Sequence, residues 1–196
     1  GSADISGWRP YAIDEYGGPP DHPGSNRSFF ARYWDAIPGA PPVRQFNPEA
    51  PDRDVETARF ARELKAVGGL DVAVLGVGTN GHVAFNEPGS GVDAGTRVVD
   101  LAPGSREAAR VAWGEAAPTW GMTIGMKELL AARAVVILAN GAHKAGIVAR
   151  ARKGGPSAEC PVSLFQHHPE VTWVLDEAAA SGANGFQPHT RSEIRP

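Results

Sequence analysis

Apolar residues along this chain fall into two patterns, short continuous runs and longer stretches with helical spacing. Continuous runs, which are typical of strands buried in a parallel sheet, span residues 70–77 (LDVAVLGV), 133–138 (RAVVIL) and 171–175 (VTWVL). We expect the run at 70–77 to form a central strand that is buried on both faces. The run at 8–13 (WRPYAI) is expected to form a further strand, which delivers Asp14 at its carboxyl end.

Stretches with helical spacing separate these strands. The apolar positions predict helices at residues 28–37, 54–67, 106–113, 123–132 and 143–152, and helical turns at 162–165 and 177–180. Asp54 is the expected N-cap of the second helix. Gly and Pro predict loops at 17–24 and 38–51. Because strands alternate with helices, the sequence predicts an α/β fold, with an open, mainly parallel sheet and helices on both faces.

Length, charge and cysteine content narrow this picture. The 196 residues suit one domain, which we place at residues 1–180, followed by a polar tail at 181–196. A net charge of −3 without a basic stripe argues against a nucleic-acid partner, and no apolar run is long enough to span a membrane. Because Cys160 is the single cysteine, no disulfide framework can form, and we expect a cytoplasmic protein without a secretory signal.

The segment richest in candidate chemistry follows the strand expected at 70–77. It reads LGVGTNGHVAFNEPGS (75–90), and its glycines allow tight turns and close approach to a ligand. His82 exchanges protons near neutral pH, and Glu87 is close enough in sequence to orient its ring. Spacing alone favours a plain glycine turn with surface side chains over such an acid–base pair. Since ligands bind at the carboxyl ends of parallel strands, Asp14, His82 and residues 140–144 are candidates for one shared crevice.

Two other short motifs carry less information. The adjacent His167 and His168 rarely point at one metal ion, and no cysteine or carboxylate cluster supports them, so we predict surface or packing histidines and no metal site. The triplet Asn26-Arg27-Ser28 matches a glycosylation acceptor, which has no meaning in a protein that is not secreted.

The stretch GVGTNGHVAFNEPGS resembles the signature of the glucosamine-6-phosphate deaminase/isomerase family, which is related to the 6-phosphogluconolactonases. Further motifs resemble the same family in the same order, and together they extend from about residue 8 to residue 180. They are Asp14-Glu15-Tyr16-Gly17 with Pro20, Asp21-His22-Pro23 and Ser28-Phe29, then Thr96-Arg97, Gly121-Met122-Thr123-Ile124-Gly125, Gly141 with Lys144-Ala145, and PVSLFQHHPEVTWVLD (161–176). The resemblance implies a modified Rossmann-like fold, here expected to lack the family's first strand and phosphate loop.

What the family does implies roles for the residues of the signature. The resemblance implies an enzyme that isomerises and deaminates glucosamine 6-phosphate to fructose 6-phosphate and ammonia, with no metal or organic cofactor. Asp14 is then the proton shuttle between C2 and C1, and His82 the acid–base residue of ring opening. Glu87 is the carboxylate that orients His82. Asn80 stands with these catalytic residues where the family often has aspartate, so it can hold the ring by hydrogen bonding but adds no negative charge.

The resemblance also implies substrate-binding and regulatory residues. Lys144 corresponds to a phosphate ligand, and Gly81 and Glu15 belong with the substrate-binding set. Arg110 is the nearest candidate for a lid arginine, about one position out of register. Arg97 corresponds to an arginine that binds an allosteric effector in some relatives. The implied partner is a small sugar phosphate, and a homo-oligomer is left open.

Two other functions stay open at this point. One is a 6-phosphogluconolactonase-type hydrolase, which shares the fold and a Gly-His turn, although Asn86-Glu87-Pro88 favours the deaminase. The other is a non-catalytic sugar-phosphate-binding relative, which Asn80 and the missing phosphate loop favour.

Overall fold

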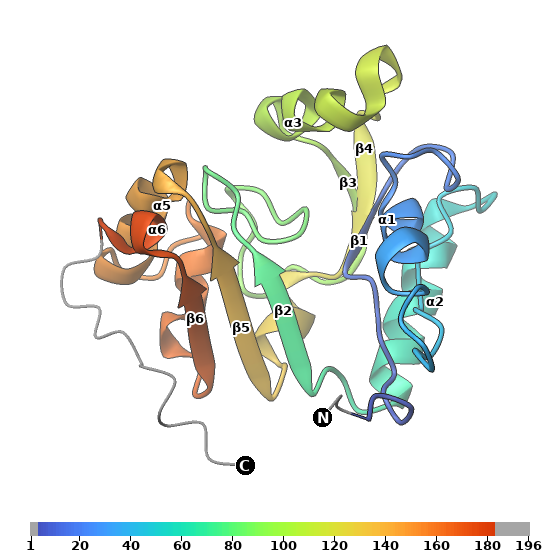
Figure 1. The fold of residues 1–196 in the computed structure, drawn as a ribbon, viewed down its shortest axis with the longest axis horizontal. Coiled ribbons are helices and arrows are strands. Elements are labelled where there is room, and N and C mark those ends of the chain that lie inside the picture. The colour runs from blue at the N-terminus through green and yellow to red at the C-terminus, as the bar shows by residue number, and fades with distance from the viewer. Residues whose placement is uncertain (1–3, 183–196) are drawn as a thin grey trace.

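The strands form two separate sheets. The computed structural model describes residues 4–182 of the chain (Figure 1). A parallel sheet has the order β2 (Val72–Gly76), β5 (Ala134–Ala139) and β6 (Val171–Leu175). An antiparallel sheet has the order β1 (Asp14–Tyr16), β4 (Trp120–Thr123) and β3 (Arg97–Asp100). The predicted α/β class with a parallel sheet is confirmed, whereas the antiparallel sheet was not predicted.

Helices connect these strands and supply much of the packing. The α-helices are α1 (Asn26–Tyr33), α2 (Arg53–Ala66), α3 (Pro103–Trp113), α4 (Met126–Leu130), α5 (Ala145–Lys153) and α6 (Glu177–Ala180), and short 3-10 helices span Gly114–Ala116, Ala142–Lys144 and Pro161–His167. The cap of α2 is Asp52, whose carboxylate accepts from the backbone N–H groups of Asp54 and Val55, both at 3.0 Å. The predicted cap, Asp54, is therefore wrong by two residues.

The N-terminal strand differs from its prediction. Residues 8–13 form an isolated parallel bridge between Tyr11 and Arg44, and the Ile13 carbonyl accepts from the Ile124 N–H at 2.7 Å, but β1 begins only at Asp14. Proline at position 10 has no N–H to donate to a ladder, which works against regular pairing there. Asp14 thus lies inside a strand that pairs antiparallel with β4, in register with Thr123. The helix predicted at 123–132 is also partly wrong, because Thr123 ends β4 and α4 begins at Met126.

The core lies on one face of the parallel sheet. Ala73, Leu75, Val135 and Ile137 point into it and are at most 2% exposed. It also contains Phe46 and Phe60, stacked with ring centroids 3.9 Å apart, and Met122, Ile124, Met126, Leu129 and Phe165. The two sheets therefore share one core, although no ladder joins them.

The opposite face of the parallel sheet is open among residues 4–182. Val72, Val74, Leu138 and Val174 on that face are 40–55% exposed. Within this range β2 is an edge strand and β5 is central. The predictions of a central strand at 70–77 and of helices on both faces are therefore wrong for this part of the chain, because exposure depends on which neighbours cover a strand and not on its own composition.

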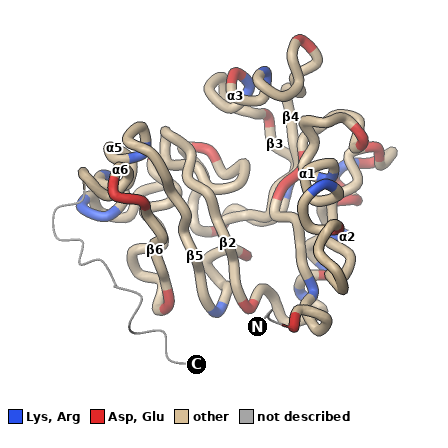
Figure 2. The backbone as a smooth tube through the Cα atoms, viewed as in Figure 1, with Lys and Arg blue, Asp and Glu red and all other residues tan. Residues whose placement is uncertain are grey.

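The charge distribution agrees with the composition. Figure 2 shows basic and acidic positions interspersed along the described chain, without a continuous basic stripe. Within residues 4–182, no helix is long and apolar enough to cross a bilayer.

The two glycines Gly125 and Gly146 offer a paired test of this packing. A Cβ at Gly125 would lie 2.1 Å from the Ala94 carbonyl oxygen, whereas a Cβ at Gly146 in α5 meets nothing within 4 Å. We expect Gly125→Ala to lower the free energy of unfolding by about 2 kcal/mol or more, because backbone must move. Gly146→Ala should raise it by roughly 0.5–1 kcal/mol. Urea unfolding measures both changes, and equal effects of the two substitutions would contradict the close packing described at Gly125.

Candidate functional site

The loop after β2 is shaped so that His82 folds back toward the strand. The N–H of Gly78 donates to the His82 carbonyl at 2.9 Å, and a Cβ on Gly78 would lie 2.2 Å from the His82 ring. Gly81 has φ +93°, and a Cβ added there would lie 2.8 Å from the Cys160 sulfur. Only glycine suits both positions. Gly81 therefore has a conformational role here, and its predicted contact with substrate stays a prediction.

A chain of hydrogen bonds fixes the His82 ring. Asn80 Nδ2 donates to Glu87 Oε2 at 2.9 Å, so Asn80 Oδ1 faces His82 Nδ1 at 2.8 Å. The carboxylate can only accept, which settles the orientation of the amide. Because Oδ1 also can only accept, Nδ1 of His82 carries the proton, and Nε2 is the basic nitrogen of the ring. Asn80, His82 and Glu87 thus form the predicted base-and-orienter arrangement.

Glu87 is held as a carboxylate. Burial alone would raise the pKa of Glu87, but hydrogen bonds involving His82, Ser105 and Asn80, together with the charge of His82, bring that pKa down to about 2. Glu87 Oε2 lies 3.4 Å from His82 Nδ1, and Glu87 Oε1 accepts from the Ser105 hydroxyl. Ser105 is buried on the first turn of α3. Sequence reasoning missed Ser105, because its partner lies 18 residues away.

Asp14 on β1 is the second acid of the site. Its residue keeps some exposed surface, but the carboxyl group itself is surrounded by protein atoms. Burial, and then the neighbouring charge of Glu15, raise the pKa of Asp14 to about 7, while His82 lowers it. The His82 ring therefore lies close enough to Asp14 to act on it electrostatically. Asn26 on α1, which sequence reasoning treated only as part of a glycosylation triplet, donates to Asp14 Oδ1 at 2.6 Å.

The segment after β4 joins Asp14 to the His82 loop. Thr123, which faces Asp14 across the ladder, accepts from the Phe85 N–H at 3.2 Å through its hydroxyl. The Asn86 side chain donates to the Ile124 carbonyl at 2.9 Å. The motif Gly121–Gly125 therefore positions the loop that carries His82 relative to β1.

Glu15 is hydrogen-bonded to the backbone at the start of α1. It is 1% exposed, and its carboxylate accepts from the backbone N–H groups of Tyr16, Asn26 and Arg27 at 2.8–2.9 Å. Burial raises the pKa of Glu15, and these donors lower it. The contacts give Glu15 a structural role in anchoring α1, and its role in substrate binding stays a prediction.

Lys144, at the end of the 3-10 helix Ala142–Lys144, contacts the start of the His82 loop. Its Nζ donates to the Val77 carbonyl at 2.6 Å, and burial lowers its pKa. Lys144 stands at the N-cap of α5, where the helix dipole favours an anion. Lys144 therefore contacts the start of the loop that carries Asn80, His82 and Glu87, and its role as a phosphate ligand stays a prediction.

The two candidate arginines lie in different surroundings. Arg110 is 66% exposed in its side chain and pairs with Glu107 at 3.2 Å on α3. Arg97 is half-buried, and its guanidinium donates to Asn86 Oδ1 at 3.0 Å and to Ser90 Oγ at 3.1 Å. Arg97 therefore braces the loop next to Glu87. Substrate binding by Arg110 and effector binding by Arg97 stay predictions.

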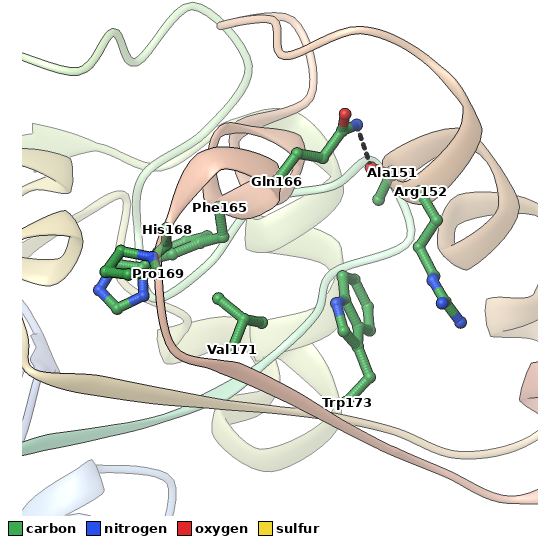
Figure 3. A pocket seen from close by; sticks show the side chains of 8 residues that line it. All are labelled: Ala151, Arg152, Phe165, Gln166, His168, Pro169, Val171 and Trp173. Carbon is green, nitrogen blue, oxygen red and sulfur yellow. Dashed lines mark hydrogen bonds between the residues drawn. The ribbon is translucent and has the colours of Figure 1, made fainter. Parts of the chain in front are cut away.

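A separate hollow of about 370 Å³ lies between α5, β6 and the 3-10 helix before β6 (Figure 3). Its lining is mixed, because polar side chains such as Arg152, Gln166 and His168 join apolar ones. None of the predicted site residues lines it. His168 lies at its rim. The His168 Nε2–H donates to the Ala132 carbonyl at 2.8 Å, and Nδ1 accepts from the Glu170 N–H at 3.1 Å. The prediction of a packing histidine is confirmed for His168, and the predicted acid–base residues Asp14 and His82 lie outside this hollow.

Known proteins resemble this chain over most of its length. A profile of the family described as glucosamine-6-phosphate isomerases/6-phosphogluconolactonase matches residues 1–173. A glucosamine-6-phosphate deaminase of an Exiguobacterium species is 40% identical over 86% of this chain and 67% of its own length. One of Bifidobacterium longum is also 40% identical, over 91% of this chain and 71% of its own.

Two solved structures resemble this chain to different degrees. A monomeric glucosamine-6-phosphate deaminase superposes with a TM-score of 0.84 at 30% identity, covering 89% of this chain and 74% of its own. A 6-phosphogluconolactonase from Trypanosoma brucei superposes with a TM-score of 0.63 at 22% identity, covering 88% of this chain and 73% of its own. The second likeness concerns the fold alone.

Ser105→Ala tests the link between α3 and the acid–base cluster. The substitution removes a donor that stabilises the Glu87 carboxylate, so we expect the pKa of Glu87 to rise and, by linkage, the melting temperature at neutral pH to fall. Carboxyl carbon NMR titration measures the pKa. Glu107→Gln, an exposed change on the same helix, is the matched control and should leave Glu87 unchanged. An unshifted Glu87 in Ser105→Ala would contradict the link.

Asp14→Asn tests the raised pKa through stability. A carboxyl whose pKa is higher in the folded state than its usual 3.8 loses stabilising free energy as pH rises from about 4 through about 7. Asparagine cannot ionise, so the variant should melt at a higher temperature than the wild type at pH 8, with a smaller gain at pH 5. Thermal melts at both pH values decide this, and a gain that does not depend on pH would exclude the explanation.

Proposed function

Because the chain belongs to the glucosamine-6-phosphate isomerase/6-phosphogluconolactonase family, we propose that it converts glucosamine 6-phosphate and water into fructose 6-phosphate and ammonia. The observation that carries the proposal is the pairing of a raised-pKa carboxyl, Asp14, with the oriented base His82 in one cluster. Relatives at 40% identity that are named glucosamine-6-phosphate deaminase support it.

His82 performs the ring opening. Its basic Nε2 takes the proton of the O1 hydroxyl and returns a proton to the ring oxygen, so that the C1–O5 bond breaks and C1 becomes an aldehyde. Glu87 and Asn80 keep the imidazole in the correct tautomer, and the Glu87 carboxylate stabilises the imidazolium that forms in between. A carboxylate with a pKa near 2 stays charged throughout this exchange.

Asp14 performs the isomerisation. The C1 aldehyde makes the proton on C2 acidic, and the Asp14 carboxylate removes it while the ammonium group on C2 gives a proton to O1, which leaves an enol with a neutral amine still on C2. Returning that proton to C1 reduces C1 and oxidises C2 to an imine, so no external electron acceptor is consumed. Water then adds to C2 and ammonia leaves, which gives the ketose. A base whose pKa is about 7 is well matched to this task at neutral pH.

Lys144 and the start of α5 are the proposed holders of the phosphate. A primary ammonium and the positive end of a helix dipole both favour an anion. The expected lack of the family's first strand and phosphate loop stays a prediction, as do a cytoplasmic location and a homo-oligomeric state. This chain spans 67–74% of the length of the relatives compared above.

The lactonase alternative rests on fold similarity at low identity. Within the described residues, the Asn86 amide and the Glu87 carboxylate are both built into the site, through Ile124 and His82. A lactonase hydrolyses an ester and needs no base at C2. The raised pKa of Asp14 therefore favours the deaminase.

Ammonia release from glucosamine 6-phosphate tests the proposal directly. His82→Ala and Asp14→Asn should each lower turnover by roughly 10²–10⁴-fold, the usual loss for a general acid or base. The exposed residues His167 and Asp35 provide matched controls, and His167→Ala and Asp35→Asn should keep wild-type rates. Because Asp14 acts only as a carboxylate, kcat/KM should rise with pH through about 7. Hydrolysis of 6-phosphogluconolactone without ammonia release would replace the proposal with the lactonase.

A further inference from the structure

The carboxylate of Asp14 has a dedicated partner on α1. Asn26 Nδ2 donates to Asp14 Oδ1 at 2.6 Å and to the Asp14 backbone carbonyl at 3.0 Å. The carbonyl oxygen can only accept, so the amide group must present its NH₂ side to Asp14. The Asn26 amide group therefore binds both the side chain and the main chain of Asp14.

We propose that Asn26 is a positioning residue that sets the orientation and the proton affinity of Asp14 in the reaction. This inference rests on the proposed function, and it names a residue outside the family motifs on which that function was based. Asn26 occupies Oδ1 of the carboxylate, which leaves Oδ2 to exchange the proton with C2 and C1 of the substrate.

The charges around Asp14 explain why a neutral donor matters. Glu15 on the same strand raises the pKa of Asp14, and His82 from the loop after β2 lowers it. Across the ladder, β4 contributes the uncharged Thr123. Burial, and then the charge of Asp14, raise the pKa of the Tyr16 phenol. A hydrogen bond to the ionised form favours that form without adding a titrating group. Asn26 thus counteracts burial, the largest cause of the raised pKa.

The helix that carries Asn26 is anchored independently of the Asn26 side chain. The backbone N–H groups of Asn26 and Arg27 donate to Glu15 at 2.9 and 2.8 Å, and Ser25 caps the helix through the Ser28 N–H at 3.0 Å. Replacing the Asn26 side chain leaves all these bonds in place. The variants are therefore expected to fold with α1 in its native position.

Asn26→Asp and Asn26→Ala, with Ser28→Ala as control, test the inference. Asn26→Asp replaces a donor with a second acid of the same shape. We expect the rising limb of the kcat/KM profile to move upward by about one pH unit or more, and turnover at pH 7 to fall roughly ten- to hundredfold. In Asn26→Ala, turnover at pH 7 should fall about tenfold and the rising limb should shift less, because the variant loses one hydrogen bond to a charged group. Ser28→Ala, on the same helix, should keep the wild-type profile.

Carboxyl carbon NMR titration of Asp14 is run on the same proteins and does not depend on turnover. If the wild type releases ammonia but the Asn26 variants keep its rate and its pH limb, the inference is wrong and the function stands. If the wild type releases none, the proposed function fails, and the NMR titration alone decides the inference. An Asp14 pKa that rises in Asn26→Asp and Asn26→Ala supports it, and an unchanged pKa overturns it.

Discussion

The site depends on β4 and the residue that follows it, which connect two sheets that share no ladder within residues 4–182. β4 pairs with β1, which carries Asp14, and its C-terminal end holds the His82 loop through the Thr123 hydroxyl and the Ile124 carbonyl. The two sheets already share one core, and these bonds fix the position of the His82 loop relative to β1. The close packing of Gly121 and Gly125 follows from the same requirement, because each lets a neighbouring backbone or ring approach the segment closely.

Electrostatics then separates two carboxyl groups into different roles. Burial and a like charge raise the pKa of Asp14 to about 7, whereas several hydrogen bonds lower that of Glu87 to about 2. Near neutral pH one acid exchanges protons and the other stays charged beside an imidazole. Pairs of titratable groups whose surroundings push their pKa values apart are typical of acid–base catalysis. The surroundings of the two carboxyl groups therefore support the proposed roles of Asp14 as proton shuttle and Glu87 as the residue that orients His82.

How much of this could be read from the sequence varied with the kind of signal. The runs that became β5 and β6 were predicted nearly to the residue, because a strand in a parallel sheet is apolar along its length. β3 was missed, and β4 was partly taken for a helix, because four residues are too few to show a period. The exposed face of β2 could not be predicted, since it depends on what lies beside the strand. Asp14, Asn80, His82, Glu87 and Lys144 were found through family motifs, whereas Ser105 and Asn26 act on partners 18 and 12 residues away that no local pattern connects to them.

Neutral amides are what allow so many titratable groups to share one site. Asn80 connects His82 to Glu87, and Asn26 holds Asp14, yet neither changes its charge with pH. Asn86 is a third amide, and it fixes the loop to the Ile124 carbonyl while accepting from Arg97. An aspartate at position 80 would place a third carboxylate around His82 and Asp14 and would oppose ionisation of a carboxyl that is already costly to ionise. With asparagine there, a neutral amide orients the His82 ring and the neighbouring Glu87 supplies a counter-charge, so no further carboxylate opposes the ionisation of Asp14 near neutral pH.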